Sequence, residues 1–299
     1  MTEPTPQATP AAASQGVPAE PSSTAPSYPA STAQPGKTKQ KEEGSFIVFL
    51  LKLIVIMLAF RTLAFAPFSI PSESMLPGLQ NGDYLLASKW NYGFSNNSLP
   101  FGIHPFPEGR ILASQPERGD VAIFKAPPLN NEDYIKRVIG LPGDQIQMIG
   151  GVLHINGIAV KKQRIADFQI PISPNTRCYS AQFAGTDKDG LPICSYPQFR
   201  ETLPNGVSYN VLDYGVTPQD DTPPVVVPDG MLFMMGDNRD NSLDSRFPAV
   251  PGQGVGLVPQ DNLVGKASIM MWSTDGSSSW PLPWTWFTAA RWSRIGGTF

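Results

Sequence analysis

The sequence is poor in histidine and cysteine: in 299 residues it has two of each, His104 and His154, and Cys178 and Cys194. Neither histidine lies in a recognisable motif, and a metal site needs more ligands than these, so we expect no metal. No organic cofactor is implied by any motif. A Ser-His-Asp triad stays open, but nothing around the histidines supports one.

A long basic block is also absent. The 22 Lys and Arg residues are balanced by 25 Asp and Glu residues, which gives a net charge of -3. Nucleic acid is therefore not expected as a partner. No internal repeat is visible.

Both cysteines lie in the part of the chain that follows a long apolar run. The segment between Cys178 and Cys194 contains Gly, Asp and Ser and is typical of a loop. An oxidising compartment would permit a disulfide between them. Sequence does not give the geometry, so the pairing stays open at this point.

The N-terminal segment lacks large side chains. Residues 1–36 consist mainly of Pro, Ala, Ser, Thr and Gln without apolar periodicity, which predicts a disordered tail. We expect a solvated extension without its own activity, although a tether or an interaction segment remains open. With the basic flank that follows, it forms a first region, residues 1–45.

The apolar run itself covers residues 46–66 and includes only three polar residues, Lys52, Arg61 and Thr62. At about 1.5 Å per residue, a helix of this length matches a hydrocarbon core roughly 30 Å thick. Lys52 and Arg61 can extend their charged ends toward the membrane surfaces. The sequence therefore predicts one transmembrane helix, with a buried soluble helix as the alternative.

Lysines precede this run, and no comparable cluster follows it directly. The positive-inside rule then predicts a cytoplasmic N-terminus and export of everything after the helix. Residues 64–66, Ala-Phe-Ala, also resemble the end of a cleaved secretory leader. The length of the run and Pro67 directly after it argue against cleavage, so we expect a retained anchor.

After residue 66, short apolar stretches alternate with turn signals. Strands are predicted at residues 83–87, 120–124, 134–139 and 151–155, and Asn156-Gly157 predicts a tight hairpin. Residues 161–228 have scattered apolar segments and indicate an inserted minor domain. Strand patterns return at 230–235 and 263–272 and should rejoin the first sheet. The fold class is therefore mainly β, with a split domain, 67–160 and 229–299, around the insertion.

The C-terminal residues 280–287 concentrate tryptophans, with Arg291 and Arg294 close behind. Tryptophan and arginine favour membrane interfaces. Packing in a folded core is an equally good interpretation of these aromatic residues, and the sequence leaves both open.

Three segments carry groups that suit nucleophilic catalysis. Ser72 and Ser74 follow the apolar run and provide hydroxyls close to a membrane surface. Lys136 lies among apolar and aromatic residues, where burial disfavours its charged form and lets the amine act as a base. Residues 235–246 contain three Asp, two Asn, two Ser and two Arg and predict a hydrogen-bonded loop.

Residues 70–77, 118–121, 134–144 and 236–246, in this order, resemble the conserved boxes of bacterial type I signal peptidases. The resemblance covers roughly residues 46–160 and 230–296. It implies a catalytic domain of coiled antiparallel β-sheets behind one membrane helix. The N-terminal tail and the segment 161–228 match only in position.

The resemblance implies that Ser74 is the nucleophile and Lys136 the general base. The Ser72 hydroxyl and the Ser74 backbone amide would form the oxyanion hole. Ser242 would position the lysine amine, and further residues would brace the loop that carries it, namely Asp237, Asp244 and Arg246.

By the same resemblance, a group of apolar residues would line shallow pockets for the Ala-x-Ala end of an exported preprotein. These residues are Phe68, Ile70, Met75, Leu85, Ile123, Tyr134 and Ile135. Taken singly, each is equally consistent with ordinary core packing. Glu73 departs from the family pattern, which often has a small residue there.

The sequence therefore predicts a serine endopeptidase of the bacterial cytoplasmic membrane, with its catalytic domain on the outer face, that removes signal peptides after small-x-small motifs. Expected partners are signal peptides, the lipid bilayer and the protein export machinery. One alternative is a specialised Ser/Lys peptidase for a single secretion or conjugation substrate. Others are a repressor-type autoprotease, for which no DNA-binding pattern is present, and an inactive peptide-binding β domain.

Overall fold

The computed structural model describes residues 39–99, 109–279 and 281–299, with side chains from residue 44 onward. The predicted disordered tail, His104 and Trp280 lie outside the described residues. The chain divides into two units, residues 1–50 and 51–299, and the second contains all the strands described below.

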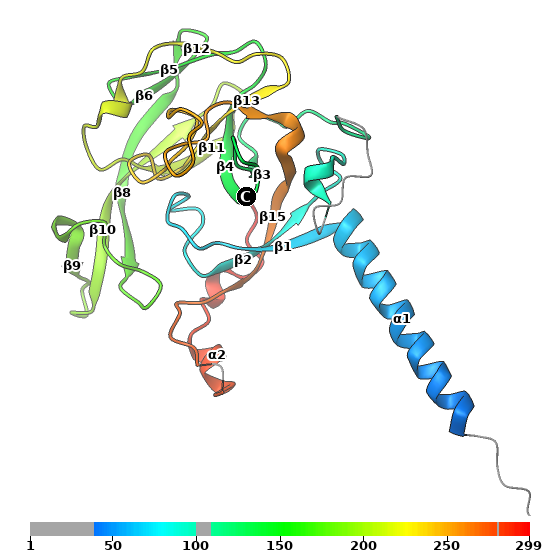
Figure 1. The fold of residues 1–299 in the computed structure, drawn as a ribbon. Helices are drawn as coiled ribbons and strands as arrows, with labels where there is room; N and C mark the ends of the chain where they lie inside the picture. Colours follow the sequence, from blue (N-terminus) through cyan, green and yellow to red (C-terminus); the bar gives the residue numbers. More distant parts are fainter. Residues whose placement is uncertain (1–38, 100–108, 280) are drawn as a thin grey trace, which may run out of the picture. The chain divides into compact units, whose positions relative to one another are not determined.

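The N-terminal element is a single long helix, α1, Lys39–Leu63 (Figure 1). Within it, residues Ser45–Leu63 are long and apolar enough to cross a membrane, and their large apolar side chains are exposed. The helix ends three residues before the predicted boundary at Ala66. The reason is that Phe65 and Ala66 already pair with a neighbouring strand, opposite Ser88 and Ala87.

Most of residues 65–273 consist of strands joined by turns (Figure 1). The strands are β1 Phe65–Ser69, β2 Asp83–Ser88, β3 Val121–Lys125, β4 Asp133–Gly140, β5 Gln145–Ile149, β6 Val152–Ile155, β7 Ile158–Ala159, β8 Lys161–Pro171, β9 Ala184–Thr186, β10 Pro192–Thr202, β11 Ser208–Leu212, β12 Val225–Val226, β13 Met231–Met235, β14 Val258–Pro259 and β15 Leu263–Ser273. A short helix follows, α2 Trp284–Thr288. The prediction of a mainly β fold is confirmed.

The largest sheet has seven strands in the order β1-β2-β15-β3-β4-β13-β14, and all its neighbouring strands are antiparallel. Both late strands, β13 and β15, join the early strands, as the sequence predicts. Register shifts interrupt the pairing of β15 with β2 and with β3. Such bulges bend a strand and increase its local twist, which lets the sheet coil.

Two smaller sheets complete the fold. One has the order β12-β5-β6-β7, and its predicted hairpin at Asn156-Gly157 is present, with His154 opposite Ala159. Both turn residues have positive φ, 54° and 78°, which Asn and Gly adopt at low cost. The other sheet, β11-β10-β8 with β9 paired to β10, occupies residues 161–212. The exact limits of an inserted domain, 161–228, stay a prediction.

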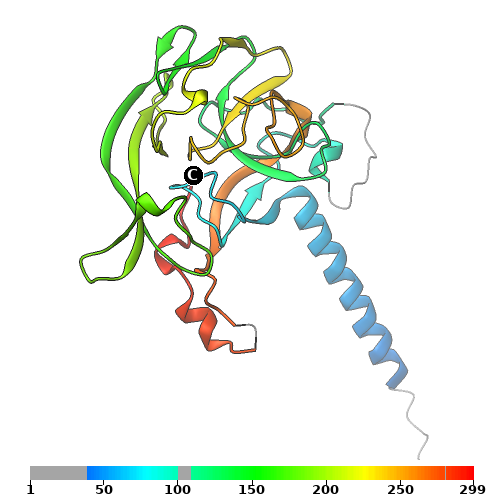
Figure 2. The ribbon, with the colours of Figure 1, turned by 60° about the vertical axis from the view of Figure 1, so that its left-hand side comes forward.

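Figures 1 and 2 show β8 and β10 running side by side, and each is eleven residues long. The sequence does not reveal β8 as a strand, because many of its side chains are exposed and no regular alternation marks it. It is held instead by its register with β10, for example Phe199 opposite Arg164.

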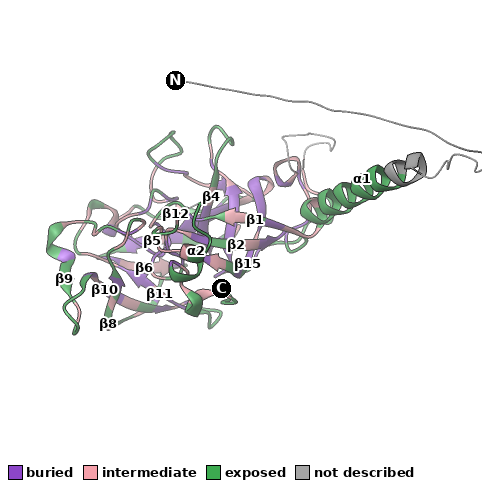
Figure 3. Ribbon diagram, turned by 90° about the horizontal axis from the view of Figure 1, so that it is seen from below, coloured by how far each residue is buried: buried purple, intermediate pink, exposed green. Residues whose placement is uncertain are grey.

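Buried apolar residues lie on all three sheets, and many of them are on the strands of the seven-stranded sheet (Figure 3). One core cluster contains Ile70, Met75, Leu85, Ile123 and Ile135. Burial of each such side chain stabilises the fold by about 1.5–3 kcal/mol. Ile70 and Met75 flank the two serines in the chain, so the same contacts that stabilise the sheet fix both ends of the serine segment.

Candidate active site

Ser74 lies in a loop between β1 and β2, and two backbone hydrogen bonds close this loop at its base. The Ile70 N–H donates to the Asp83 carbonyl at 2.8 Å, and the Gly82 N–H donates to the Ile70 carbonyl at 3.0 Å. Lys136 comes from β4, in the same sheet. Its Nζ lies 2.7 Å from Ser74 Oγ and donates a second hydrogen bond, 3.0 Å long, to the Ile135 carbonyl.

Both groups of this pair are buried, with Ser74 9% and Lys136 4% exposed. Burial lowers the pKa of the Lys136 amine to about 8, although the Asp244 and Asp237 carboxylates act in the opposite direction. A substantial fraction of the amine is therefore neutral in mildly alkaline solution. A neutral amine at hydrogen-bond distance from a hydroxyl can accept its proton.

Ser72 lies beside the pair, with its Oγ 3.3 Å from Ser74 Oγ. It is exposed, so its hydroxyl can reach a group that enters from solvent. The structure thus brings Ser72, Ser74 and Lys136 together as the sequence predicts.

Asn238 fixes the loop from the other side, a role that sequence reasoning misses. Its N–H donates to the Ser74 carbonyl at 3.1 Å, and its Nδ2 donates to the Glu73 carbonyl at 3.1 Å. The same Nδ2 donates to the Tyr214 hydroxyl at 2.8 Å. Its position in the predicted polar loop could have pointed to this role, because an asparagine side chain has both a hydrogen-bond donor and an acceptor.

Asp237, next to Asn238, pairs with Arg137 through two hydrogen bonds of 2.8 and 2.6 Å. Successive residues of a strand point to opposite faces, so Lys136 faces Ser74 while Arg137 reaches Asp237. The Arg137 guanidinium also stacks over the Tyr209 ring, 4.2 Å from its centre. Asp237 therefore anchors the polar loop to the strand that carries the lysine.

Asp244 and Arg246 form a second buried pair, with Oδ1 2.9 Å from the Arg246 Nε. Asp244 also accepts the Gly236 N–H at 3.0 Å. Burial raises the pKa of Asp244, but the Arg246 guanidinium and these hydrogen bonds outweigh it, so the net pKa is below its ordinary value. These contacts tie Asp244 and Arg246 to the polar loop, and their bracing role stays a prediction.

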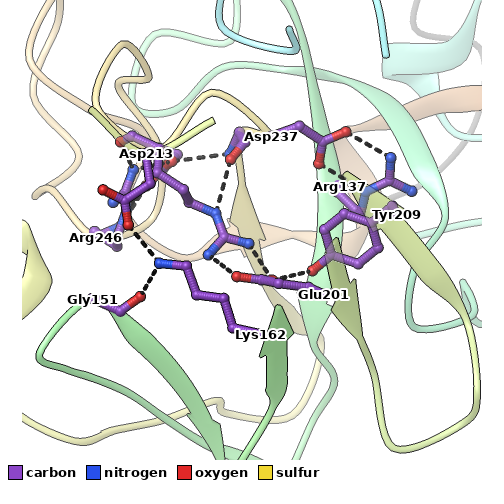
Figure 4. Close-up of polar contacts among 11 residues, drawn as sticks. Arg137, Gly151, Lys162, Glu201, Tyr209, Asp213, Asp237 and Arg246 are labelled. Carbon is purple, nitrogen blue, oxygen red and sulfur yellow. Dashed lines mark hydrogen bonds and ion pairs between the residues drawn. The ribbon is translucent and has the colours of Figure 1, made fainter. Parts of the chain in front are cut away.

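Further ion pairs and hydrogen bonds connect the polar loop to the sheet β11-β10-β8, called the second sheet below (Figure 4). Arg239 makes two 2.6 Å hydrogen bonds to Glu201 of β10, and the Tyr209 hydroxyl of β11 donates to Glu201 at 2.9 Å. Lys162 of β8 pairs with Asp213 at 2.5 Å. Buried charges of this kind are costly unless fully paired, so the loop and the second sheet are held in one arrangement.

Ser242 is buried against Gly236, and among the described residues its Oγ has no hydrogen-bond partner. A Cβ at position 236 would lie 2.2 Å from Ser242 Oγ and 2.6 Å from the Ser74 carbonyl oxygen. Only glycine therefore fits there. Ser242 lies beside the serine loop, and its Oγ makes no hydrogen bond to the Lys136 amine, so its positioning role stays a prediction.

A cavity of about 510 Å³ opens onto the serines and the lysine. Five of the seven predicted pocket residues line it, namely Phe68, Ile70, Ile123, Tyr134 and Ile135. The other two, Met75 and Leu85, are buried in the core cluster below it. The cavity is also lined by Asn241 and Leu243 of the polar loop, which sequence reasoning did not assign to it.

A disulfide joins Cys178 and Cys194 in the second sheet region. Cys194 belongs to a buried cluster with Leu76, Tyr196 and Leu212. Since Leu76 follows Ser74 by two residues, the disulfide lies in the packing that supports the serine loop. Among residues 39–99, 109–279 and 281–299, no group of three or more His, Cys, Asp and Glu side chains is arranged to hold a metal ion.

A serine hydroxyl beside a buried amine on coiled antiparallel sheets, next to an apolar cavity, is an arrangement that suits a serine hydrolase. The chain matches the model of the signal peptidase family, peptidase S26, over residues 44–272. The chain belongs to this family.

Individual relatives agree. A signal peptidase I of Rickettsia prowazekii is 38% identical over 247 residues, covering 80% of this chain and 82% of the relative. One from Rickettsia massiliae is 37% identical over 246 residues, covering 80% and 81%. A crystal structure of a signal peptidase I from Enterococcus faecalis is 24% identical, covers 52% of this chain and 98% of that chain, and has a TM-score of 0.27. The family match and the two Rickettsia relatives show that the chain is a serine endopeptidase that removes signal peptides.

Proposed function

We propose that Ser74 attacks the scissile carbonyl and that Lys136 is its general base. The observation that carries this proposal is the 2.7 Å distance between Lys136 Nζ and Ser74 Oγ inside a buried site. The neutral amine accepts the hydroxyl proton as Oγ bonds to the carbonyl carbon. The resulting ammonium then gives this proton to the leaving amine, which leaves an ester on Ser74.

Hydrolysis of the ester follows by the same groups in reverse. The neutral Lys136 amine takes a proton from water, the hydroxide attacks the ester carbonyl, and the proton returns to Ser74 Oγ. The amine is poised for both steps because its pKa of about 8 lies near the pH of the surrounding solution.

The Ser72 hydroxyl and the Ser74 backbone N–H are the proposed donors to the oxyanion. Ser72 Oγ lies on the same side as Ser74 Oγ, 3.3 Å away, which supports this role. Asn238 holds the carbonyls of Glu73 and Ser74, so it fixes the orientation of the peptide unit that carries the Ser74 N–H.

The substrate end is proposed to be a small-x-small motif that lies in the apolar cavity. Walls made by Phe68, Ile70, Ile135 and Leu243 leave room for small side chains and disfavour bulky ones. Glu73 is half-buried beside the nucleophile, and burial raises the pKa of its carboxyl above the ordinary value.

The proposed location is the outer face of a bacterial cytoplasmic membrane, with the N-terminus in the cytoplasm and α1 as a retained anchor. The apolar stretch of α1 and the lysines before it support this orientation. The exposed side chains of Trp284, Phe287 and Trp292 support an additional contact of the C-terminal region with the bilayer surface. The export machinery is a proposed partner because it delivers the substrate.

The test uses the full chain in detergent and a peptide whose leader ends in Ala-x-Ala. We expect cleavage after the second Ala, and none when either Ala is replaced by Trp. Ser74→Ala and Lys136→Ala should abolish cleavage, and Ser72→Ala should reduce kcat by roughly 10²- to 10³-fold with little change in KM.

Ser195→Ala provides a matched control, because this half-buried hydroxyl lies on β10, outside the cavity lining. It should cleave at the rate of the unaltered chain. Full activity of Ser74→Ala or Lys136→Ala, with the fold intact by circular dichroism, would contradict the mechanism.

A further inference from the structure

A second cavity, of about 660 Å³, lies at the C-terminal end of α1, and the proposed mechanism does not use it. Its charged lining consists of three cations, Arg61, Lys89 and Lys125, and one carboxylate, Asp133. Amide side chains, including those of Asn97 and Asn131, add further polar groups. The cavity therefore carries an excess of positive charge and suits an anion.

The backbone fixes the first two cations beside each other. Arg61 is in the last turn of α1, and the Lys89 N–H donates to the Ala64 carbonyl at 3.1 Å. Directly after Ala64, β1 begins and pairs Phe65 with Ser88, the residue before Lys89. The proximity of Arg61 and Lys89 thus follows from regular secondary structure rather than from a loop.

Among the described residues, neither of these two cations forms a salt bridge with a carboxylate, although the charge of Asp133 acts on Lys89 from a greater distance. Lys89 is 3% exposed, and its Nζ donates to the Ser98 carbonyl. Burial, together with the neighbouring Arg61 charge, lowers the pKa of Lys89 to about 8. Asp133 is engaged by Lys125 at 2.9 Å. An anion between Arg61 and Lys89 would relieve their repulsion and the cost of burying the ammonium.

The position along the chain indicates which anion this is. Arg61 belongs to the last turn of the apolar helix, which sets the depth of the cavity at one membrane surface. Trp90, 49% exposed, packs edge-on against Phe65 with 4.6 Å between ring centres. Tryptophan is enriched at the level of lipid headgroups. Phosphate groups of phospholipids lie at this same level.

We propose that this cavity binds the phosphate of an anionic phospholipid, with Arg61 and Lys89 as the principal contacts. The guanidinium offers a forked pair of donors to phosphate oxygens, and the ammonium offers a point charge. Phe68 and Asp133 line both this cavity and the one at the serines. A bound lipid would therefore lie next to the substrate cavity and hold its entrance at the headgroup level.

The test is a calorimetric titration of the full chain in nonionic detergent at pH 7, where Lys89 is mostly protonated. The probes are dihexanoyl phosphatidylglycerol, dihexanoyl phosphatidylcholine and inorganic phosphate. Phosphatidylglycerol should saturate one site. Phosphatidylcholine should give only a heat of mixing with micelles that does not saturate. Inorganic phosphate should bind at least about tenfold more weakly than phosphatidylglycerol, because it lacks the glyceride contacts.

Arg61→Gln should weaken phosphatidylglycerol binding about tenfold or more, the usual effect of losing one charge-assisted hydrogen bond. Arg61→Lys should keep most of the affinity, and it separates loss of the charge from failure to fold. Lys188→Gln is the matched control, because Lys188 is an exposed cation outside the cavity lining. It should bind phosphatidylglycerol as the unaltered chain does.

Three results would overturn the proposal. They are equal binding of phosphatidylglycerol and phosphatidylcholine, undiminished binding by Arg61→Gln, and binding of inorganic phosphate as tight as that of phosphatidylglycerol. The last result would identify a site for free anions instead. Cleavage of the Ala-x-Ala peptide is measured separately in each variant, so failure of the lipid site and failure of the proposed catalytic pair are distinguishable.

Discussion

Lys136 lies in β4 and Lys89 directly follows β2, and these two strands belong to the same seven-stranded sheet. Both are nearly completely buried, at 4% and 3% exposed, and burial lowers the pKa of each amine to about 8. Their neighbours differ. Lys136 Nζ faces the Ser74 hydroxyl, whereas Lys89 Nζ faces the Ser98 carbonyl and has the Arg61 guanidinium as a charged neighbour.

A depressed pKa alone therefore does not make a lysine a catalytic base. The neutral amine of Lys136 has a proton donor in reach, which the nucleophilic step requires. The carbonyl beside Lys89 has no proton to give, and Arg61 adds a positive charge that favours an anion instead. In the two proposals, the same desolvation would serve proton transfer at Lys136 and anion binding at Lys89.

The largest expected effect separates the two lysines by activity. Lys136→Met should lower kcat/KM for the Ala-x-Ala peptide by at least about 10³-fold, because the base is lost. Lys89→Met, measured in detergent without anionic lipid, should lose less than about tenfold, since no bond is made or broken at Lys89. Similar losses in both variants would remove the distinction.

The pH dependence of cleavage is a second way to distinguish Lys136 from Lys89. We expect kcat to rise with pH by about tenfold per unit below pH 8 and to level off above it, because only the neutral Lys136 amine accepts the proton. Lys89→Met should show the same profile as the unaltered chain, even though Lys89 titrates in the same range. A profile that shifts in Lys89→Met would assign the controlling group to Lys89.

The sequence predicted the pieces of the active site but not how they are held. Strands with clear apolar patterns, such as 134–139 and 263–272, were found because burial on a sheet leaves a periodic trace. The pairing of Ser74 with Lys136 came from a family resemblance, since 62 residues separate them and no local pattern reports such contacts.

The parts that escaped prediction depend on contacts distant in sequence. Arg239 meets Glu201 across 38 residues, and Asn238 meets Glu73 across 165. Strand β8 is recognisable only through its pairing with β10, and the end of α1 is set by the pairing of β1 with β2. The cavity at Arg61 and Lys89 likewise has no motif, because it arises only where the helix and the sheet join.

The smallest expected effect is on stability. The pKa of Lys136 is about 8 in the folded state, below the ordinary value of 10.5, so the unfolded chain binds more protons between these values. Lys136 therefore lowers the free energy of unfolding, by its full amount below about pH 8. This cost shrinks as the pH rises and is gone above about pH 10.5. The shift corresponds to a penalty on the order of 3 kcal/mol at most.

Lys136→Met should accordingly raise the Tm of the catalytic unit by several °C at pH 7, and this gain should shrink toward pH 10.5. A fall in Tm at pH 7 would show that the protonated lysine is held favourably, contrary to the proposed base. Lys89→Met should also gain stability at pH 7 in pure detergent. Its gain should be smaller with phosphatidylglycerol present, because a bound phosphate stabilises the charged Lys89 but leaves the Lys136 penalty in place.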